Sequence, residues 1–481
     1  MEFIKKYKNE LFLAVVILGV ALFSLSTLTT KPRFWTDEGL SIELARNFTS
    51  FGRLDLMVEP GIFSGTPFLL QSTGYPMTLP LALFFKIAGV GPWQARVYAL
   101  AIMLVFLLVV YFFVKNIFGA RHAGLSLLLL ATFASFYGSG RCVTGEVLGF
   151  IFLLVGLYAI LYKDKFFLGG LLVGLAIAAK PSVYLMAAPA IMLVFLLDWR
   201  GFWQRALRFC AGIAPAAILW VFLSIPDVFL TDAWLKILNF YKNPFGQVSI
   251  IDSVVVNLIS WPHSTTLIYF SFLFLAVLAT IFWDKKFFAA NRRLFIFITA
   301  YVVLSFAYFL KSPGWLRYLA AAEFLILMIL APVAQSIINK FGQSRIGFFA
   351  KNKNRLFYGA ILLLALIQGI HLNTKSDLFY STATTDTVNF LNKEPEGKTI
   401  GLSNSIDVGG LILSDKKYQI LSTLTGLPAL GPDFLAFEPR RLPDLVVAGS
   451  EDAILAAHKG VIGEFYNLIY DNGKYNIYAK K

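Results

Sequence analysis

Long apolar runs separated by short polar stretches make up the chain from its first residues to Leu372. The first run, Leu11–Thr29, is nearly all apolar and carries no charge, which is typical of a transmembrane helix. Further runs follow at Val97–Val114, Leu125–Tyr137, Val147–Tyr162, Phe166–Ala179, Val183–Leu197, Phe209–Ile225, Leu267–Trp283, Leu294–Leu310, Leu316–Ile338 and Leu356–Leu372. The pattern predicts an all-α polytopic membrane bundle of about eleven spans.

One more apolar segment, Pro76–Val90, does not fit this series. It is short and contains both Pro80 and Lys86, whereas a helix needs about twenty residues to cross the hydrocarbon core. We therefore expect a re-entrant or interfacial helix on the outer face. If this segment crossed the membrane, the orientation of every later loop would be inverted.

The composition is that of a membrane protein. Of 481 residues, 58% are hydrophobic and 15% are charged, whereas soluble chains carry about 25% charged residues. The net charge of +14 would suggest nucleic acid in a soluble protein. Here the basic residues cluster in short loops between apolar runs, where they act as topology signals facing anionic lipid. We expect membrane lipid, and no nucleic acid, as a partner.

The basic loops also orient the chain, because cytoplasmic loops are enriched in Lys and Arg. With the N-terminus inside, the strongly basic short loops all fall inside, at Lys115/Arg121, Lys163/Lys165, Arg200/Arg205/Arg208, Lys285/Lys286/Arg292/Arg293 and Lys340 through Arg355. This predicts a multi-pass plasma-membrane protein with an extracytoplasmic C-terminus. Cys142 and Cys210 then lie at opposite faces, so no disulfide is expected.

The last part of the chain, 373–481, is polar and has a different pattern. Helical stretches such as Thr384–Lys393 and Glu451–Lys459 alternate with short β-rich runs. These runs are Lys398–Ser403, Tyr418–Leu421, Asp444–Ala448 and Tyr475–Tyr478. We therefore predict two parts, a membrane domain at 1–372 and a small extracytoplasmic α/β domain at 373–481.

Cysteine labelling tests this orientation. In a chain lacking both native cysteines, Ser381→Cys should react with an impermeant maleimide added outside intact cells. Ser344→Cys should not react, because the basic stretch Lys340–Arg355 is predicted to be cytoplasmic. Labelling of Ser344→Cys from outside would contradict the eleven-span topology.

Asp37 and Glu38 stand side by side just after the first span, in Pro32-Arg-Phe-Trp-Thr-Asp-Glu-Gly39. An acidic pair at the mouth of a span indicates a general base or a metal ligand. The alternative is structural: a solvated loop acid, or the start of a helix that continues through Ser41–Asn47.

Other short loops at the predicted outer ends of the spans, here called mouths, also carry charged residues. Arg141 and Glu146 flank a mouth whose glycines allow close approach of the backbone to a ligand. Lys180 precedes Pro181, where the helix must break. Each has a structural alternative: an ion pair at the mouth, a Glu146 favoured by a helix N-terminus, or a Lys180 that reaches the lipid headgroups.

Arg317 and Tyr318 lie at the outer entrance of the tenth span, in Ser312-Pro-Gly-Trp-Leu-Arg-Tyr318. A guanidinium group presents a planar fork that matches phosphate, and the alternative is an interfacial anchor within an aromatic belt. Glu323, about two turns further into the span, is interpreted as the buried partner of Arg317.

An acidic pair and several cations at one face of an apolar bundle indicate an amphiphile with a phosphate head. Its tail would lie in lipid, and its phosphate would meet Arg and Lys. The sequence has no Walker loop, no dinucleotide glycine fingerprint on a strand and no Cys/His metal spacing. The energy for a reaction can therefore be stored in a lipid–phosphate substrate.

These motifs resemble those of a known family. Phe34-Trp-Thr-Asp-Glu-Gly39 resembles the Asp-Glu signature of the GT-C membrane glycosyltransferases, in the branch of the protein O-mannosyltransferases and lipid A aminoarabinose transferases. Gly140-Arg-Cys-Val-Thr-Gly-Glu146, Gly174-Leu-Ala-Ile-Ala-Ala-Lys-Pro181 and Gly314-Trp-Leu-Arg-Tyr318 are similar to further motifs of that branch. The resemblance covers roughly residues 1–372. One departure is Glu146, where related enzymes often have Asp.

The resemblance implies a polyprenyl-phosphate sugar donor, and transfer of its sugar with inversion to a hydroxyl of a glycan, lipid or protein acceptor on the outer face. Asp37 is then the general base and Glu38 orients it or the acceptor. The implied substrate-binding residues are Arg141, Glu146, Lys180, Arg317 and Tyr318, the cations holding the departing phosphate. No cofactor is required, although some relatives use a divalent metal near the acidic loop, which leaves metal open.

Two other classes of function compete with this one. A transporter or flippase for lipid-linked sugars would also carry charges at span mouths, but such proteins place their sites near the midplane, often between inverted repeats. An inactive assembly subunit would leave the Asp-Glu pair without a role. The sugar, the acceptor and the lipid chain length are not encoded in any motif.

Overall fold

The computed structural model describes residues 2–59, 61–65, 73–225, 229, 231–242, 249–341, 347–376, 380–395, 397–403, 408, 417–422, 442–449 and 463–481. Each predicted apolar run is helical. The bundle contains α1 (Glu2–Leu25), α5 (Pro92–Phe118), α6 (Ala120–Ala131), α7 (Ala134–Gly140), α8 (Glu146–Lys163), α9 (Phe166–Ala179), α10 (Pro181–Tyr184), α11 (Ala187–Phe195), η1 (Leu196–Gly201), α12 (Phe202–Ser224), α15 (Thr265–Trp283), α16 (Lys285–Ala290), α17 (Arg292–Lys311), η3 (Leu316–Leu319), α18 (Ala320–Phe341) and α19 (Gly347–Ser376).

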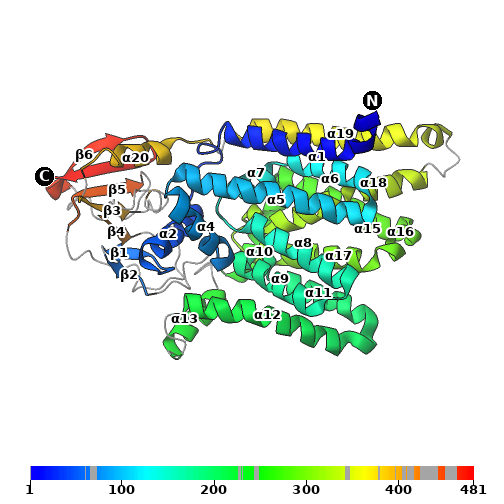
Figure 1. The fold of residues 1–481 in the computed structure, drawn as a ribbon, viewed down its shortest axis with the longest axis horizontal. Coiled ribbons are helices and arrows are strands. Elements are labelled where there is room, and N and C mark those ends of the chain that lie inside the picture. Colours follow the sequence, from blue (N-terminus) through cyan, green and yellow to red (C-terminus); the bar gives the residue numbers. More distant parts are fainter. Residues whose placement is uncertain are drawn as a thin grey trace.

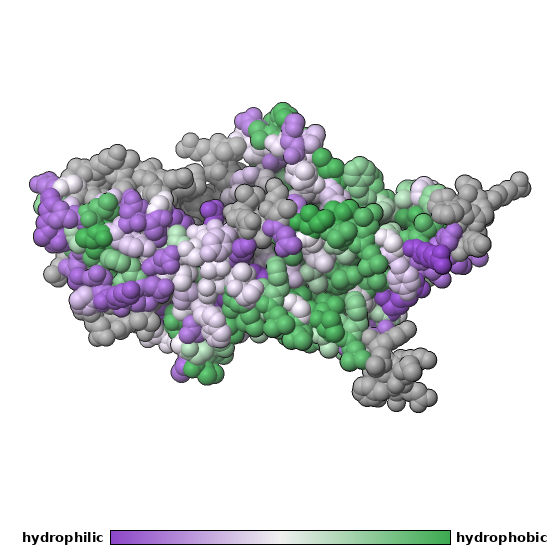
Figure 2. Space-filling model, turned by 90° about the horizontal axis from the view of Figure 1, so that it is seen from above, coloured by the Kyte–Doolittle hydropathy of each residue, from purple (hydrophilic) through white to green (hydrophobic). Residues whose placement is uncertain are grey.

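Within the described residues, seven helices are long and apolar enough to cross a membrane, and an eighth is added if the bent pair α6 and α7 counts as one span. Shorter apolar helices are Asn9–Leu25, Tyr75–Ala88 and Phe166–Ala179. The chain is thus a multi-pass membrane protein, while the count of eleven spans stays a prediction. Figure 2 shows apolar surface along the bundle between two hydrophilic ends.

α18 forms the centre of the bundle. All residues of its segment 320–333 are buried, as expected for a helix that is apolar on every side. The ring of Phe324 meets the rings of Phe106, Phe136 and Phe150, with centroids 5.3, 6.2 and 5.4 Å away. The outer end of α18 continues from η3, so the core fixes the place of Arg317.

The predicted span Leu125–Tyr137 is not one straight helix. It divides into α6 and α7, which are bent by 72°. Thr132 ends α6, and its hydroxyl donates to the carbonyl of Leu128 at 3.0 Å and to Gln368 Oε1 at 2.8 Å. A threonine hydroxyl that bonds back to the preceding turn favours such a bend. The bend directs α7 toward the mouth that carries Arg141 and Glu146.

Further elements lie at the end of the bundle where the chain passes from α1 to α5. They are α2 (Thr36–Phe51), β1 (Met57–Glu59), β2 (Ile62–Phe63) and α4 (Tyr75–Ala88). α4 corresponds to the segment predicted not to cross, and Figure 1 places it beside α2. The second outer loop forms α13 (Thr231–Lys242), α14 (Ile250–Ser260) and η2 (Trp261–His263).

The C-terminal part forms α20 (Ala383–Leu391), β3 (Thr399–Ser403), β4 (Lys417–Ser422), β5 (Leu445–Gly449), β6 (Tyr466–Asp471) and β7 (Tyr475–Lys480). The sheet order is β4-β3-β5-β7-β6. β3 is parallel to β4 and β5, and β7 is antiparallel to β5 and β6.

The four predicted strands of the tail are observed, and β6 was missed. The turn between β6 and β7 contains Asn472-Gly473, with Gly473 at φ +80°, and this dipeptide is a strong hairpin signal. The predicted helix Glu451–Lys459 and the labelling position Ser344 lie outside the described residues.

The sheet is joined to the first outer loop. A single hydrophobic cluster contains Leu40 and Ile42 of α2 together with Ile400, Leu402 and Val447 of the sheet. Figure 1 shows this head at one end of the bundle and the N-terminus at the other. The first outer loop is therefore held between the bundle and the tail.

Candidate functional site

Asp37 and Glu38 lie in the first turn of α2, which begins at Thr36. The N-terminus of a helix favours carboxylates, because its free N–H groups carry partial positive charge. Successive residues of a helix point about 100° apart, so the two acids face different surroundings. Asp37 remains partly accessible, with 22% of its side chain exposed, whereas the Glu38 side chain is fully buried.

Asp37 lies in a cluster of two carboxylates and two cations. Its Oδ2 atom is 2.5 Å from Arg317 Nη1 and 3.8 Å from Lys180 Nζ. Lys180 Nζ is also 3.8 Å from Glu146 Oε1. Four residues from four separate segments of the chain are thus brought together.

The end of α9 and the start of α8 bring Lys180 and Glu146 close to each other. α9 ends at Ala179 because Pro181 follows Lys180, whose backbone is non-helical. Gly145 has φ +83°, and a Cβ there would lie 2.4 Å from the carbonyl oxygen of Ala179. Only glycine fits this approach, so the start of α8 lies against the end of α9.

The Lys180 ammonium is a buried charge of the cluster. Its side chain is 1% exposed, and Nζ has no hydrogen-bond partner among the described residues. Its two carboxylate neighbours, at 3.8 Å, are beyond hydrogen-bonding distance. A buried ammonium without a hydrogen bond is costly, so this position favours binding of a further anion.

The cations control the ionisation of Asp37. Burial by itself would raise the pKa of the carboxyl, but Lys180 and Arg317 oppose it, and the pKa lies below its usual value. Asp37 is therefore a carboxylate at neutral pH.

Arg317 lies among aromatic rings. The centre of its guanidinium is 4.8 Å from the ring centroid of Trp315, 5.5 Å from that of Trp35 and 5.8 Å from that of Tyr318. Rings on several sides restrict its rotamers and add cation–π attraction. Tyr318 is buried and also contacts the Tyr308 ring at 5.6 Å.

Glu323 is not the partner of Arg317, so that interpretation was wrong. Glu323 is buried within α18, where its carboxyl group bonds with Ser135. Arg317 pairs with Asp37 instead. Arg317 on η3 and Glu323 on α18 are close in sequence but contact different residues. The partner of Arg317 is Asp37, which is distant in sequence.

The Glu38 carboxylate is held by Arg96, a residue that the sequence analysis missed. Arg96 Nη2 is 2.6 Å from Glu38 Oε2, and both side chains are fully buried. The Arg96 guanidinium also lies 4.2 Å from the Phe34 ring, and Val143 N–H donates to Glu38 Oε1 at 3.4 Å. A signal was present, since a lone arginine at the outer start of a span runs against the positive-inside rule.

Arg141 is not brought to the Asp37 cluster. Its guanidinium donates to the carbonyls of Phe23 and Lys31 at 2.9 and 3.0 Å, and to the hydroxyls of Ser24 and Thr27 at 3.3 and 2.9 Å. These contacts join the second mouth to the end of α1. The geometry supports a positioning role for Arg141.

Arg96→Leu should destabilise the protein by about 3–5 kcal/mol, because it removes the cation that pairs with the buried Glu38 carboxylate. Thermal unfolding in detergent should show this loss. The double variant Glu38→Leu/Arg96→Leu should recover much of it, and Arg33→Leu, at an exposed position of the same loop, is the control. An Arg96→Leu variant as stable as the control would show that the pair is not structural.

The described residues around Asp37 do not form a binding site for a divalent metal. They contain no group of three His, Cys, Asp or Glu side chains that could hold an ion. The nearest carboxylates, of Asp37 and Glu146, have the Lys180 ammonium within 3.8 Å of both. A metal cation there would be repelled by the ammonium, so the donor set is that of an ion-pair cluster.

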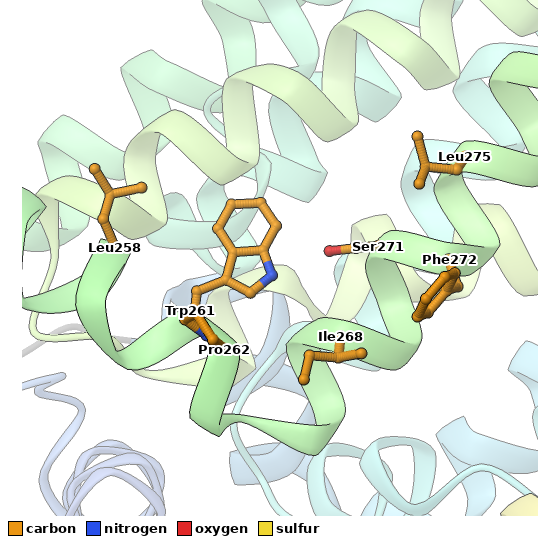
Figure 3. A pocket seen from close by; sticks show the side chains of 7 residues that line it. All are labelled: Leu258, Trp261, Pro262, Ile268, Ser271, Phe272 and Leu275. Atoms are coloured by element: carbon orange, nitrogen blue, oxygen red, sulfur yellow. The ribbon is translucent and has the colours of Figure 1, made fainter.

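An open apolar cavity lies between α14, η2 and α15, with a volume of about 440 Å³. It is lined by Leu258, Trp261, Pro262, Ile268, Ser271, Phe272 and Leu275 (Figure 3). Trp261 packs with Leu267, Phe309 and Leu319 in one hydrophobic cluster. Leu319 belongs to η3, two residues after Arg317, so Trp261 packs against the element that carries Arg317.

Comparison with known proteins gives one family match. The family model described as dolichyl-phosphate-mannose-protein mannosyltransferase matches residues 77–225. This range contains Arg96, Glu146 and Lys180 and lies between the mouths of Asp37 and Arg317. No curated protein matches the chain.

Solved structures match over most of the chain. ArnT from Cupriavidus metallidurans bound to undecaprenyl phosphate has a TM-score of 0.59 at 14% identity, covering 98% of this chain and 98% of that chain. Archaeal oligosaccharyltransferase AglB from Archaeoglobus fulgidus, in complex with an inhibitory peptide and a dolichol-phosphate, has a TM-score of 0.54 at 12% identity, covering 99% of this chain and 75% of that chain. The chain therefore has a GT-C-like fold, and the predicted resemblance to GT-C glycosyltransferases is confirmed.

Proposed function

We propose that this chain is a glycosyltransferase that moves a sugar from a polyprenyl phosphate to an acceptor hydroxyl at the outer face of the plasma membrane. The acceptor is a glycan, lipid or protein of the cell envelope. The observation that carries the proposal is the convergence of Asp37, Arg317 and the unsatisfied Lys180 ammonium at one mouth. A base and two phosphate-binding cations are the groups that such a transfer needs.

In the proposed reaction, the acceptor oxygen attacks the anomeric carbon of the donor while the bond from that carbon to the phosphate oxygen breaks. The proton of the acceptor hydroxyl goes to the Asp37 carboxylate. The electron pair of the broken bond stays on the polyprenyl phosphate. Arg317 and Lys180 stabilise the charge that develops there, which lowers the barrier directly.

Binding of the donor would itself make Asp37 a better base. Without a donor, Asp37 is paired with Arg317 at 2.5 Å, and its pKa is low because Lys180 and Arg317 outweigh the effect of burial. A donor phosphate would compete for both cations, and the pKa of Asp37 would then rise. Proton transfer is most efficient when the pKa of the base is close to the operating pH. The base would therefore become effective only when the donor is bound.

Other predicted site residues would support this arrangement. Glu146 would hold the Lys180 ammonium together with Asp37. Tyr318 would limit the rotamers of the Arg317 fork. Glu38, bound to Arg96, would fix the first turn of α2 and so orient Asp37.

The apolar cavity around Trp261 would receive the first isoprene units of the donor. Trp261 of its lining packs against Leu319 of η3, the element that carries Arg317. A lipid whose phosphate is bound by Arg317 would thus find an apolar wall next to its head. The matching ArnT structure has undecaprenyl phosphate bound, and the matching AglB structure has a dolichol-phosphate bound.

The decisive experiment uses the purified chain in lipid nanodiscs with a set of polyprenyl-phosphate sugars. Glycosyl transfer predicts release of free polyprenyl phosphate that depends on an added acceptor. A transporter or flippase would instead move labelled donor across liposomes without consuming it. Movement without any release of polyprenyl phosphate would reject the transferase. Mass spectrometry of cell-envelope glycans, with and without the gene, would identify sugar and acceptor.

A further inference from the structure

Asn257 lies on α14, in the second outer loop, and no sequence motif marks it. It is 7% exposed, and its side-chain amide nitrogen donates to carbonyls at the end of α17. The acceptors are Phe309 at 3.3 Å, Leu310 at 3.0 Å and Ser312 at 2.7 Å. The last carbonyls of a helix have no partner within the helix. One amide from another loop therefore caps α17.

The same amide packs against the turn that follows α17. Gly314 has φ +77°, and a Cβ at this position would lie 2.5 Å from Asn257 Oδ1. Both the conformation and the contact require glycine. Ser312 adds a local bond, since its hydroxyl accepts from Gly314 N–H at 3.3 Å. Asn257 thus binds the end of α17 through its side-chain nitrogen, and its side-chain oxygen packs closely against the turn at Gly314.

This turn leads directly into the charged cluster. After Gly314 come Trp315, whose ring lies under the Arg317 guanidinium, and then η3. The N–H of Tyr318 donates to the carbonyl of Trp315 at 3.0 Å, so the turn and η3 are continuous. Arg317 is three residues from Gly314 and contacts Asp37 at 2.5 Å. A displaced turn would displace the guanidinium.

We infer that Asn257 is a positioning residue for the phosphate site: by capping α17 and holding the Gly314 turn, it aims Arg317 at the donor phosphate and Asp37. The inference rests on the proposed function for the identity of the ligand. It gives the second outer loop, α14 in particular, a role in donor binding. The hydrogen bonds of Asn257 go to the end of α17 and not to the charged cluster.

The test is a double-mutant cycle that measures binding of polyprenyl phosphate, without any sugar, to the full-length protein in nanodiscs. Asn257→Ala should weaken binding about tenfold, a coupling usual for residues linked through a shared backbone shift. In an Arg317→Ala background, the same substitution should have no further effect, because there is no guanidinium left to aim. Asp252→Ala, at an exposed position of α14, is the matched control and should bind like wild type.

Gly314→Ala provides a second variant that does not depend on how well Asn257→Ala folds. The added methyl group would press on Asn257 Oδ1 and displace the same turn. It should weaken binding in the presence of Arg317 and have little effect without it. Equal losses in both backgrounds, or wild-type affinity for both variants, would overturn the positioning role, since a general loss of stability would not depend on Arg317.

A ligand-free measurement separates this inference from the proposed function. Carbodiimide modifies protonated carboxyl groups, so peptide mass spectrometry against pH can follow Asp37, which faces Lys180 and Arg317 with Glu146 and Tyr318 nearby. Asn257→Ala should move the midpoint of modification to higher pH, because Arg317 no longer opposes protonation. If wild type bound no polyprenyl phosphate, the proposed function would fail, while an unmoved midpoint would reject the inference itself.

Discussion

Replacing Asp37 with asparagine should slow sugar transfer by about a hundredfold to ten-thousandfold, the range expected for loss of a general base. Lys180 and Arg317 outweigh the effect of burial and keep the pKa of Asp37 below its usual value, so wild type has a carboxylate at neutral pH. Asparagine keeps the shape of the side chain but cannot take the proton of the acceptor. Release of polyprenyl phosphate from labelled donor, under single-turnover conditions, measures the effect.

The same variant should separate turnover from binding. Asp37 Oδ2 lies 2.5 Å from Arg317 Nη1 without a donor, so it competes with the donor phosphate for this cation. Asp37→Asn should therefore bind polyprenyl phosphate at least as tightly as wild type while transferring almost nothing.

Asp252→Asn, at an exposed position of α14, serves as the control and should retain full turnover. Donor turnover by Asp37→Asn at the wild-type rate would show that Asp37 is not the base. Loss of both turnover and binding would instead indicate that the substitution disturbs the mouth as a whole.

Arg317→Ala should nearly abolish transfer and lower the affinity for polyprenyl phosphate, whereas Arg317→Lys should keep part of both. Lysine retains the positive charge but loses the bidentate fork that matches phosphate. Removing one donor that stabilises developing charge typically costs about a hundredfold to a thousandfold in rate. Binding of a polyprenyl phosphate without sugar, measured for the three proteins, should fall in the order wild type, lysine, alanine.

Arg33→Ala removes an exposed arginine from the same outer face and should leave binding unchanged. This control separates a specific contact from general attraction between a basic face and an anionic lipid, which salt screens at exposed sites. If Arg317→Ala bound polyprenyl phosphate as tightly as wild type, Arg317 would be only an interfacial anchor held by Trp35 and Trp315.

Much of the secondary structure could be predicted from the sequence, because each apolar run has to satisfy its own backbone hydrogen bonds within a membrane. This condition is local, and the helices therefore lie where the runs lie. The bend between α6 and α7 could not be predicted in this way, since it depends on Thr132 meeting Gln368 of a distant helix. The edge strand β6 was missed although the Asn472-Gly473 turn beside it is a hairpin signal.

The candidate site was predicted in part. Charged residues next to breaks in apolar runs are costly and therefore conspicuous, and this rule identified Asp37, Glu146, Lys180 and Arg317. It could not separate Asp37 from Glu38, which are adjacent in sequence. Only the direction in which each leaves α2 makes the first partly accessible and the second a buried partner of Arg96.

By itself, the sequence determined that this is a membrane bundle with a polar tail and that several charges gather at the mouths of its spans. The tertiary structure decided which charges meet: Asp37 with Arg317 and Lys180, Glu38 with Arg96, and Asn257 with the end of α17. The physical reason is that apolar periodicity and helix breaks are properties of neighbouring residues, whereas these contacts join segments separated by at least fifty positions. Such pairings have no period in the sequence and arise only when the helices pack.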